Sequence, residues 1–333
     1  MTSSPQPTAQ PTIIDIEDAA RRLSGMAVVT PLLESPVVNK RLGGRLLIKA
    51  EPMQRTGSFK FRGAYNRLSR IDGDAKKRGV VAYSSGNHAQ GVAAAAQILG
   101  MPAVIVMPAD APAIKIRNTR SYGAEVVTYD RLNESREAIG QKLQRERGAV
   151  LVPPFDDPFI IAGQGTIGLE LAQQAEAAGA ALDAVLAACS GGGLLAGIAT
   201  AMKARQPSVA VYAVEPQGFD DLSRSLKSGK RETNDPGARS ICDALLAPTP
   251  GELTFSINSH LLSGGFAVSD DEVRQAMAVA FEDYKLVVEP GGAVALAAVL
   301  SGKFPARGKT VAVVCSGGNV DPDVFASAIR ARA

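Results

Sequence analysis

The stretch VVAYSSGNH at residues 80–88 is one of three places where a short apolar strand runs directly into a Ser/Gly loop; the others are VLAACSGGG at 185–193 and VAVVCSGGN at 311–319. The first two loops precede alanine-rich segments, 89–99 and 194–204, that are typical of helices, so their free backbone N–H groups can bind an anion. In a parallel sheet such loops meet at the carboxyl ends of the strands, where ligands bind. The three loops together predict one site for a small anionic cofactor and an anionic substrate.

The composition excludes several classes of protein. With 333 residues, 46% of them apolar, the chain can build one large domain or two lobes with a cleft. Lys and Arg are dispersed and the net charge is only +3, so we expect neither nucleic-acid nor membrane binding. The cysteines form no CxxC pair, and Cys189 and Cys315 end apolar strands, which predicts reduced thiols in a reducing compartment and no metal–cysteine site.

We expect no targeting segment in the amino-terminal residues. Residues 1–12 are rich in Ser, Pro and Gln without an apolar signal core, and we expect them to form a disordered tail. No apolar run is long enough to span a bilayer. These features predict a cytoplasmic protein. Because the chain ends soon after Asn319, we expect no appended carboxy-terminal regulatory domain.

Strand and helix patterns divide the chain into three stretches: one near the amino end, one in the middle and one after residue 163. Near the amino end they predict a helix over 15–24, a strand over 45–50 and a helix over 58–68 with Ser58 as its N-cap. A later series, after residue 163, has strands near 185, 209 and 311, whereas 216–265 shows little periodicity and is either a surface excursion or a ligand-holding loop. Between them lies a predicted small parallel sheet, with strands at 80–83, 103–107 and 125–129 and helices at 89–99, 115–122 and 134–147.

Lys60 carries the strongest chemical signal. It lies in TGSFKFRG (56–63), between Phe59 and Phe61. Most lysines are simply solvated, but a lysine among apolar groups has a lowered pKa and can form an imine or act as a base. A Schiff-base lysine, a glycine-lined phosphate cup and a hydroxyl at the end of a strand, here Ser316, are the parts that pyridoxal 5′-phosphate requires.

At these residues the chain resembles the fold-type II family of pyridoxal-phosphate enzymes, and within it the serine/threonine dehydratase and serine racemase branch. The resemblance runs from about residue 16 to 330 and is carried by SFKFRGA (58–64), SGNHAQG (85–91), IAGQGT (161–166), the triple glycine and SGGN (316–319). It implies an α/β architecture of two lobes, similar to tryptophan synthase β, each an open, mostly parallel sheet flanked by helices. Residues 1–73 and 153–333 would form the large cofactor-binding domain, and 74–152 a small mobile domain.

The resemblance implies a role for each residue of the cofactor site. Lys60 would hold the cofactor and then act as the base on one face of the substrate. Ser316 would face the pyridine nitrogen, where a hydroxyl gives a weaker electron sink than a carboxylate and so favours prompt loss of a β-hydroxyl. Ser190 stands where relatives often have a fourth glycine, and we expect it to be tolerated. The other contacts would come from Phe59 against the ring, Asn87 to the phenolic oxygen, and the backbone N–H groups of Gly191, Gly192, Gly193 and Leu194 around the phosphate.

The resemblance places substrate recognition on the first loop. Ser84, Ser85, Asn87 and His88 would bind the substrate, with its carboxylate near Ser85 and Asn87. In racemase relatives the residue at Ser85 donates a proton from the face opposite the lysine, so racemisation stays open. Arg136 would ordinarily be a surface charge, but in racemase and hydroxyaspartate dehydratase relatives an arginine in this context lies near the substrate, where it could recognise a second carboxylate.

A divalent cation is also implied by the resemblance. Glu215 and Asp221, joined by a backbone carbonyl near Phe219, match the cation site of the racemase-like branch. Two acids in a loop are usually just solvated, so this prediction depends on the resemblance alone. Oxygen ligands of this kind suit Mg²⁺ or Ca²⁺, which would be structural here.

These expectations predict a pyridoxal-phosphate-dependent ammonia-lyase acting on L-threonine, L-serine or a related β-hydroxy amino acid. The alternative on the same scaffold is a serine racemase or a 3-hydroxyaspartate dehydratase. A nucleotide-dependent oxidoreductase is disfavoured because none of the three glycine loops has G-x-G-x-x-G followed by an acidic residue about twenty further on, and a serine hydrolase because no G-x-S-x-G elbow occurs. A pure binding module would not need Lys60. We expect a small-molecule amino-acid substrate and a homodimer.

Overall fold

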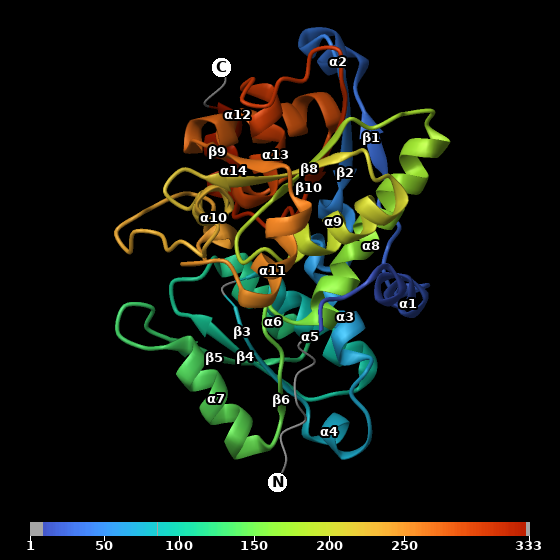
Figure 1. Ribbon diagram of the computed structural model, residues 1–333. Coiled ribbons are helices and arrows are strands. Elements are labelled where there is room, and N and C mark those ends of the chain that lie inside the picture. The colour runs from blue at the N-terminus through green and yellow to red at the C-terminus, as the bar shows by residue number, and fades with distance from the viewer. Residues whose placement is uncertain (1–8, 85, 331–333) are drawn as a thin grey trace.

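The structure, a computed structural model, describes residues 9–84 and 86–330 and contains two open sheets. In Figure 1 the larger sheet lies in the upper half of the molecule and the smaller one in the lower half. The six-stranded sheet has the spatial order β1 (Leu32–Glu34), β2 (Arg45–Ala50), β10 (Thr310–Cys315), β7 (Ala184–Ala188), β8 (Ala210–Pro216) and β9 (Gly264–Val268). The four-stranded sheet has the order β5 (Glu125–Tyr129), β4 (Ala103–Pro108), β3 (Val80–Tyr83) and β6 (Val150–Leu151).

The strand order brings the predicted loops together. Within the described residues every strand pair is parallel except β1 with β2. Because β10 and β7 are neighbours in register, with Val314 opposite Ala187, the loops that follow them leave the same edge side by side. The predicted α/β class with mostly parallel sheets and flanking helices is confirmed.

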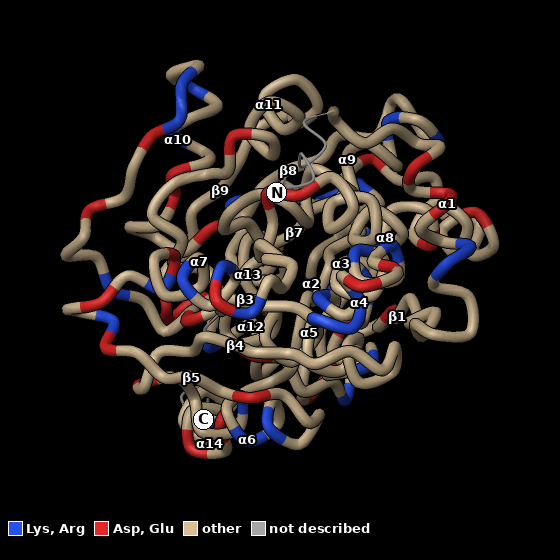
Figure 2. The backbone as a smooth tube through the Cα atoms, turned by 90° about the horizontal axis from the view of Figure 1, so that it is seen from below, with Lys and Arg blue, Asp and Glu red and all other residues tan. Residues whose placement is uncertain are grey.

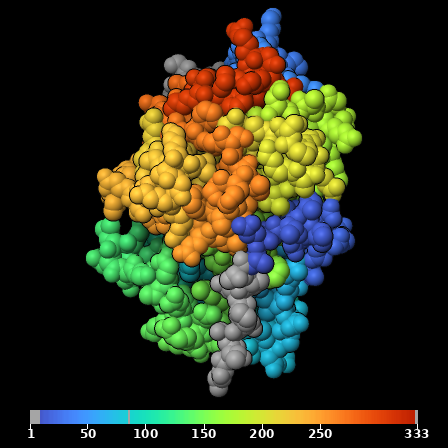
Figure 3. All heavy atoms as spheres, viewed as in Figure 1, coloured from blue at the N-terminus to red at the C-terminus, as the bar shows by residue number. Residues whose placement is uncertain are grey.

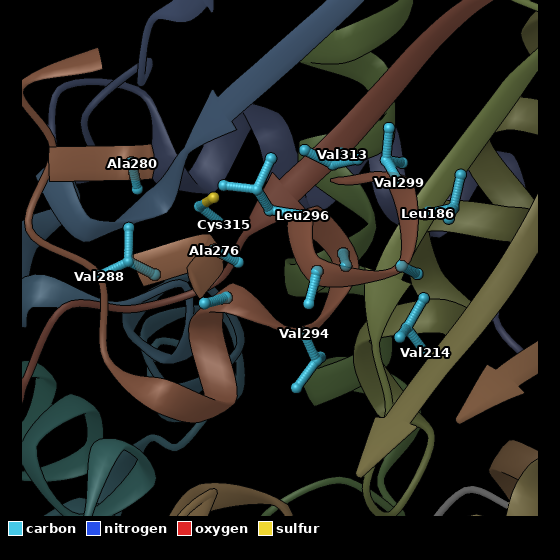
Figure 4. Close-up of a cluster of buried hydrophobic side chains, with 14 of the residues drawn as sticks. Leu186, Val214, Ala276, Ala280, Val288, Val294, Leu296, Val299, Val313 and Cys315 are labelled. Carbon is cyan, nitrogen blue, oxygen red and sulfur yellow. The ribbon is translucent and has the colours of Figure 1, made fainter. Parts of the chain in front are cut away.

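Helices cover both faces of the larger sheet. Successive side chains of a strand point to opposite faces, so in β10 Val311, Val313 and Cys315 pack on one face and Ala312 and Val314 on the other. Figure 4 shows the first face, where the labelled side chains of α13 (Pro290–Leu300), Val294, Leu296 and Val299, lie among those of β7, β8 and β10. The first face is covered by α2 (Pro36–Leu42), α12 (Asp270–Tyr284), α13 (Pro290–Leu300) and α14 (Pro322–Arg330), and the second by α8 (Pro158–Ala177) and α9 (Gly193–Arg205).

The smaller sheet shares its core with a helix from outside residues 74–152. Phe61, Ala64 and Leu68 of α3 (Lys60–Leu68) are fully buried in one cluster with Ile105 and Met107 of β4. The helix that begins with Lys60 is therefore packed on both halves of the molecule. The other helices around this sheet are α4 (Gly73–Arg78), α5 (Asn87–Leu99), α6 (Ala113–Ser121) and α7 (Arg136–Arg147).

The segment between β8 and β9 contains more regular structure than its sequence suggests. It forms α10 (Asp221–Ser228), the short helix η3 (Asp243–Leu245) and α11 (Glu252–Leu261). In Figure 3 this yellow-to-orange chain covers the outer surface of the upper half, directly above the green lower half. The low periodicity is explained by the shortness of α10 and by the long irregular stretch that separates it from η3.

Two details at the amino end differ from the sequence expectations. The helix predicted from Ser58 begins instead at Lys60, and Ser58 pairs with Gly317 as an isolated antiparallel bridge. Within the predicted tail, Thr12 forms a capping box with Asp15 at the start of α1 (Ile13–Leu23), and Gln10 Nε2 donates to Ser256 Oγ at 3.0 Å. The remaining short helices are η1 (Glu51–Met53) and η2 (Arg55–Gly57).

Charge is spread over the molecule. Figure 2 shows Lys and Arg interspersed with Asp and Glu around the chain. The part of the chain that the structure describes has no helix both long and apolar enough to cross a membrane.

Glycines let three helices pack against one another with almost no space between their backbones. A Cβ added at Gly163 of α8 would lie 2.6 Å from the carbonyl oxygen of Arg62 and 2.7 Å from Gly63 Cα, both in α3. On the other side of α8, a Cβ at Gly197 of α9 would lie 2.4 Å from the carbonyl oxygen of Ile161. The IAGQGT stretch therefore fixes how close α3, and Lys60 with it, comes to the larger sheet.

We expect Gly163→Ala to destabilise the protein by about 1–3 kcal/mol, because the clash is with backbone that must move rather than with a flexible side chain. Chemical denaturation of the variant measures this. Gln173→Ala on the exposed face of the same helix is the control and should change stability by less than about 0.5 kcal/mol. An unchanged denaturation midpoint for Gly163→Ala would show that α3 and α8 have room that the structure does not give them.

Candidate functional site

The loops that follow β3, β7 and β10 all line one cavity. It contains about 980 Å³ of space between protein atoms, part of it open to solvent. The predicted residues that line it are Phe59, Lys60, Ser84, Asn87, His88, Arg136, Gly191, Gly192, Gly193, Leu194 and Ser316. Ser85 lies outside the described residues, and Glu215, Phe219 and Asp221 do not line this cavity.

Lys60 projects into the cavity from the first residue of α3. Its Nζ donates to the carbonyl oxygen of Pro154 at 2.7 Å and lies 5.2 Å from the centre of the Phe59 ring. Burial lowers the pKa of Lys60 to about 8, and the positive end of the α3 dipole also favours the neutral amine. Compared with an ordinary lysine, a much larger fraction of this amine is unprotonated near neutral pH and able to attack a carbonyl group or take up a proton.

The turn before Lys60 is held by the third loop. Thr56 and Gly57 both have positive φ, 66° and 71°, and the side-chain amide of Asn319 donates to the carbonyl oxygen of Thr56 at 2.8 Å. A Cβ at Gly57 would lie 2.7 Å from Asn319 Oδ1, so only glycine fits there. Just beyond, the Phe59 N–H donates to the Ser316 carbonyl oxygen at 3.0 Å. Lys60 and Ser316 are thus joined through the backbone.

The second loop forms a cup at the N-terminus of α9. Gly192 has a φ of 93°, and a Cβ at Gly191 would lie 2.3 Å from the Phe155 ring, so neither position tolerates a side chain. Two side chains of α11 hold the carbonyl oxygens of this loop: Thr254 Oγ1 donates to Gly191 at 2.6 Å and Asn258 Nδ2 to Gly192 at 3.1 Å. With these oxygens engaged outside the cavity, the helix start presents its N–H groups, which suits a phosphate.

Ser190 does not obstruct the cup. Its hydroxyl oxygen accepts a hydrogen bond from the Ala247 N–H at 3.2 Å, so the hydroxyl proton is free to donate to an anion. This arrangement agrees with the expectation that serine is tolerated where relatives often have glycine.

The amide of Asn87 has a defined orientation. Asn319 Nδ2 donates to Asn87 Oδ1 at 2.9 Å, and Asn87 Nδ2 donates to Glu289 Oε1. Both interactions require that the side-chain nitrogen of Asn87, and not its oxygen, faces Glu289. Because an amide nitrogen has two hydrogens, the second remains for a ligand in the cavity, which is the donor expected for a phenolic oxygen.

His88 is a neutral, fully buried imidazole. Its Nε2 lies 3.1 Å from the Val152 carbonyl oxygen, which can only accept, so Nε2 carries the proton and Nδ1 is an acceptor. Burial, and to a smaller extent the charge of Lys60, lowers the pKa of His88 to about 3. His88 is therefore an acceptor near the ligand and not a proton donor from Nδ1.

Two guanidinium groups face the cavity from the smaller-sheet half. Arg136 begins α7, lies 5.6 Å from the centre of the Tyr83 ring and pairs with Glu137 at 2.7 Å. Arg131, which sequence reasoning did not single out, also lines the cavity and pairs with Asp110 at 3.1 Å. On the same side, Ser84 Oγ accepts from the Gly86 N–H at 3.1 Å and so helps shape the first loop.

The predicted cation ligands form a buried carboxylate pair away from the cavity. Glu215 is the penultimate residue of β8 and accepts from the N–H groups of Leu222 and Ser223 at 2.9 and 2.8 Å. Asp221 Oδ1 accepts from Asn234 Nδ2 at 2.6 Å, whereas Oδ2 is buried without a hydrogen-bond partner. Burial raises the pKa of Glu215 to about 8 and that of Asp221 to about 6. Among the described residues no group of three or more His, Cys, Asp or Glu side chains is arranged to hold a metal.

Sequence reasoning missed the charged residues behind Asn87. Glu289 is buried and pairs at 2.9 Å with Lys115, which also pairs with Asp243 at 2.7 Å. A signal for Glu289 existed, since it is a lone acid between the apolar Val287-Val288 and a Pro-Gly-Gly helix start. Lys115 gave none, because a lysine on an ordinary helix is usually solvated.

Comparisons with known proteins show which proteins this chain is similar to. Residues 23–317 match the family model described as pyridoxal-phosphate dependent enzyme. The L-threo-3-hydroxyaspartate ammonia-lyase of Pseudomonas sp is 44% identical over 95% of this chain and 98% of its own. Among solved structures, the threonine deaminase of T.th. is 46% identical with a TM-score of 0.88, covering 93% of this chain and 99% of that one. Maize serine racemase is 37% identical with a TM-score of 0.90, covering 97% and 98%.

The lowered pKa of Lys60 predicts its reactivity. In cofactor-free protein, acetylation of Lys60 by a trace of acetic anhydride should rise with pH with a midpoint near 8, because only the neutral amine reacts. A lysine in an unstructured peptide, added as internal standard, should rise at about 10.4. Peptide mapping of the labelled protein gives both curves. Coincident midpoints would contradict the desolvated position of the amine.

Proposed function

Because the chain belongs to the family of pyridoxal-phosphate-dependent enzymes, we propose that it is an ammonia-lyase that converts an L-β-hydroxy amino acid into a 2-oxo acid and ammonia. The observation that carries the proposal is the convergence of the Lys60 amine, the glycine cup before α9 and the Ser316 hydroxyl on one cavity. The names of two relatives, a threonine deaminase and a hydroxyaspartate ammonia-lyase, support the type of reaction.

The residues of the cavity fit the cofactor. The three glycines at 191–193 provide N–H donors without a projecting side chain, which suits the phosphate, and the second hydrogen of Asn87 Nδ2 suits the phenolic oxygen. Phe59 would flank the ring, and Ser316 would face its nitrogen. When bound, pyridoxal phosphate would supply the electron sink for the electrons of the substrate Cα–H bond.

The chain's own groups would handle the proton. Lys60 is the base in our proposal, since about half of its amine is neutral near pH 8 and its Nζ is oriented by the Pro154 carbonyl oxygen. The side chains of Phe155 and Leu194 on the cavity wall would limit access of water to the reacting carbon. Racemisation would need a second proton donor on the opposite face. His88 is unsuited to that task, so Ser85 keeps this proposed role.

The two arginines favour a substrate with a second carboxylate. Arg131 and Arg136 line the same cavity, and the carboxylates with which they pair are largely exposed, with side-chain exposures of 66% for Asp110 and 49% for Glu137. Such exposed pairs are weak and exchange easily for a better-placed anion. We therefore propose 3-hydroxyaspartate as a substrate beside L-threonine and L-serine, in line with the name of the Pseudomonas relative.

We also propose that Glu215, Asp221 and the Phe219 carbonyl hold a divalent cation. The support is chemical: two carboxylates lie buried near each other, and one oxygen of Asp221 has no hydrogen-bond partner. A hard cation such as Mg²⁺ or Ca²⁺ would compensate both charges and tie α10 to the end of β8.

The function is tested on the purified protein loaded with pyridoxal phosphate. Borohydride reduction should fix a pyridoxyl group on the peptide that contains Lys60, and L-β-hydroxy amino acids should give 2-oxo acid and ammonia in equal amounts. Lys60→Ala should abolish turnover. Labelling of another lysine would refute the assignment of the base, and D-amino acid as the main product, seen by chiral chromatography, would replace the lyase by a racemase.

Substitution of the arginines tests the second carboxylate. Arg136→Met should raise KM for L-threo-3-hydroxyaspartate roughly tenfold or more while changing KM for L-threonine much less, since a charged hydrogen bond is worth about 1.5–3 kcal/mol. Arg131→Met should act in the same direction. The control is Arg145→Met on the outer part of α7, which should leave both constants unchanged. Equal effects of Arg136→Met on both substrates would assign the guanidinium to the α-carboxylate instead.

Removal of the cation gives a separate measurement. Chelation should lower the melting temperature, and Mg²⁺ or Ca²⁺ should restore it, because a ligand at about 100 times its Kd stabilises by roughly 2.7 kcal/mol. In Asp221→Asn the response to the cation should disappear. A melting curve that stays the same after metal analysis has verified removal would exclude a structural cation.

A further inference from the structure

Lys115 connects the two halves of the molecule from a completely buried position. It lies on α6, in the smaller-sheet half, with a side-chain exposure of 1%. Its Nζ contacts two carboxylates of the other half: Asp243 Oδ2 in η3 at 2.7 Å and Glu289 Oε2, at the start of α13, at 2.9 Å. Nearby, the Ile114 N–H of α6 donates to Asp321 Oδ1 at 3.3 Å. The start of α6 is thus attached to the larger-sheet half at two points.

The first loop is packed directly on the stem of this lysine. A Cβ at Gly86 would lie 2.5 Å from Lys115 Cδ, so the loop that carries Asn87 can approach only as glycine. The next residue, Asn87, donates to Glu289 Oε1 through Nδ2. Glu289 therefore accepts from Asn87 with one oxygen and faces Lys115 with the other.

The charge on Glu289 depends on its neighbours. Burial raises the pKa of Glu289, and Lys115 opposes this effect. Burial alone would also lower the pKa of Lys115, but Glu289 and Asp243 together raise it above its ordinary value. Removal of either partner would leave an uncompensated buried charge, which is then neutralised by gain or loss of a proton. A protonated Glu289 has an O–H donor in place of one acceptor oxygen, and its remaining neutral oxygen accepts more weakly from Asn87 than a carboxylate does.

We propose that Lys115 is a positioning residue: by holding Glu289 as a carboxylate when the two halves are together, it turns the Asn87 amide so that its remaining N–H points to the phenolic oxygen of the cofactor. This inference depends on the proposed function, because it assumes pyridoxal phosphate in the cavity. Lys115 touches neither cofactor nor substrate in this scheme. It acts through Glu289 and Asn87, and it makes the donor to the cofactor depend on contact between the halves.

The test compares Lys115→Met with Lys49→Met. Lys49 is a matched control, since it is also fully buried, pairs with Glu170 at 2.6 Å and does not line the cavity. Both variants should lower the melting temperature of the cofactor-free protein. Only Lys115→Met should shift the long-wavelength absorption band of bound pyridoxal phosphate and weaken its binding, by roughly tenfold, as expected for loss of a hydrogen bond from a charged network.

A second comparison separates a role that acts through Glu289 from a general loss of stability. In Glu289→Gln a neutral carbonyl oxygen can still accept from Asn87 without a cation behind it. Lys115→Met should therefore have little further effect on the absorption band or on cofactor affinity when it is added to Glu289→Gln. Equal effects of Lys115→Met in both backgrounds, or an unchanged band and affinity in the single variant, would overturn the inference.

The two proposals fail in different ways. If the wild-type protein does not bind pyridoxal phosphate on Lys60, the proposed function itself is wrong. If the wild-type protein binds it and Lys115→Met behaves like Lys49→Met, only the positioning role is wrong.

Discussion

The bridge between Ser58 and Gly317 is the constraint on which the site depends. It attaches the segment that carries Lys60 to the loop after β10, the strand beside β7 in the larger sheet. The Phe59 N–H and the Asn319 amide add bonds on either side, at 3.0 and 2.8 Å. The backbone position of Lys60 is thereby fixed, although its side chain is long and flexible. The distance from its amine to the cup and to Ser316 is set by backbone hydrogen bonds rather than by the lysine itself.

Glycine serves two separate purposes around this frame. In the cup, Gly191 and Gly192 leave room for the side chains of Phe155 and of α11, and Gly192 adopts a backbone conformation that side chains avoid. In α8 and α9, Gly163 and Gly197 remove side chains so that helices approach at backbone distance. The two uses are connected, because the helices that pack so closely carry Lys60 on one side and the cup on the other. A change in helix spacing would move the base relative to the phosphate site.

Sequence reasoning succeeded where a short local pattern has one structural outcome. An apolar run followed by Ser and Gly predicted β3, β7 and β10 with their loops, because buried parallel strands must end in loops at one edge. It was wrong about the start of α3, since the partner of Ser58 lies more than 250 residues away at Gly317 and no local signal distinguishes a bridge from an N-cap. Lys115 was missed for the same reason. Its burial results from carboxylates in a distant part of the chain, and sequence alone gives a lysine on a polar helix.

The buried carboxylates of this fold differ in whether a basic side chain compensates their charge. Glu51 and Glu170 share Arg62 at 2.8 and 2.6 Å, Asp157 pairs with Arg67, and Glu289 pairs with Lys115. Glu215 and Asp221 are as deeply buried, yet within the described residues neither has a cationic side chain within ion-pair distance. Hydrogen bonds from Leu222, Ser223 and Asn234 satisfy three of their four oxygens but supply no positive charge. The other carboxylates are compensated by Lys or Arg. The charge of Glu215 and Asp221 would instead be compensated by a bound cation or by a proton. A divalent cation carries one more positive charge than the proton that it would replace. Binding of the cation must therefore release protons, in proportion to the fraction of molecules in which the Glu215–Asp221 pair is protonated.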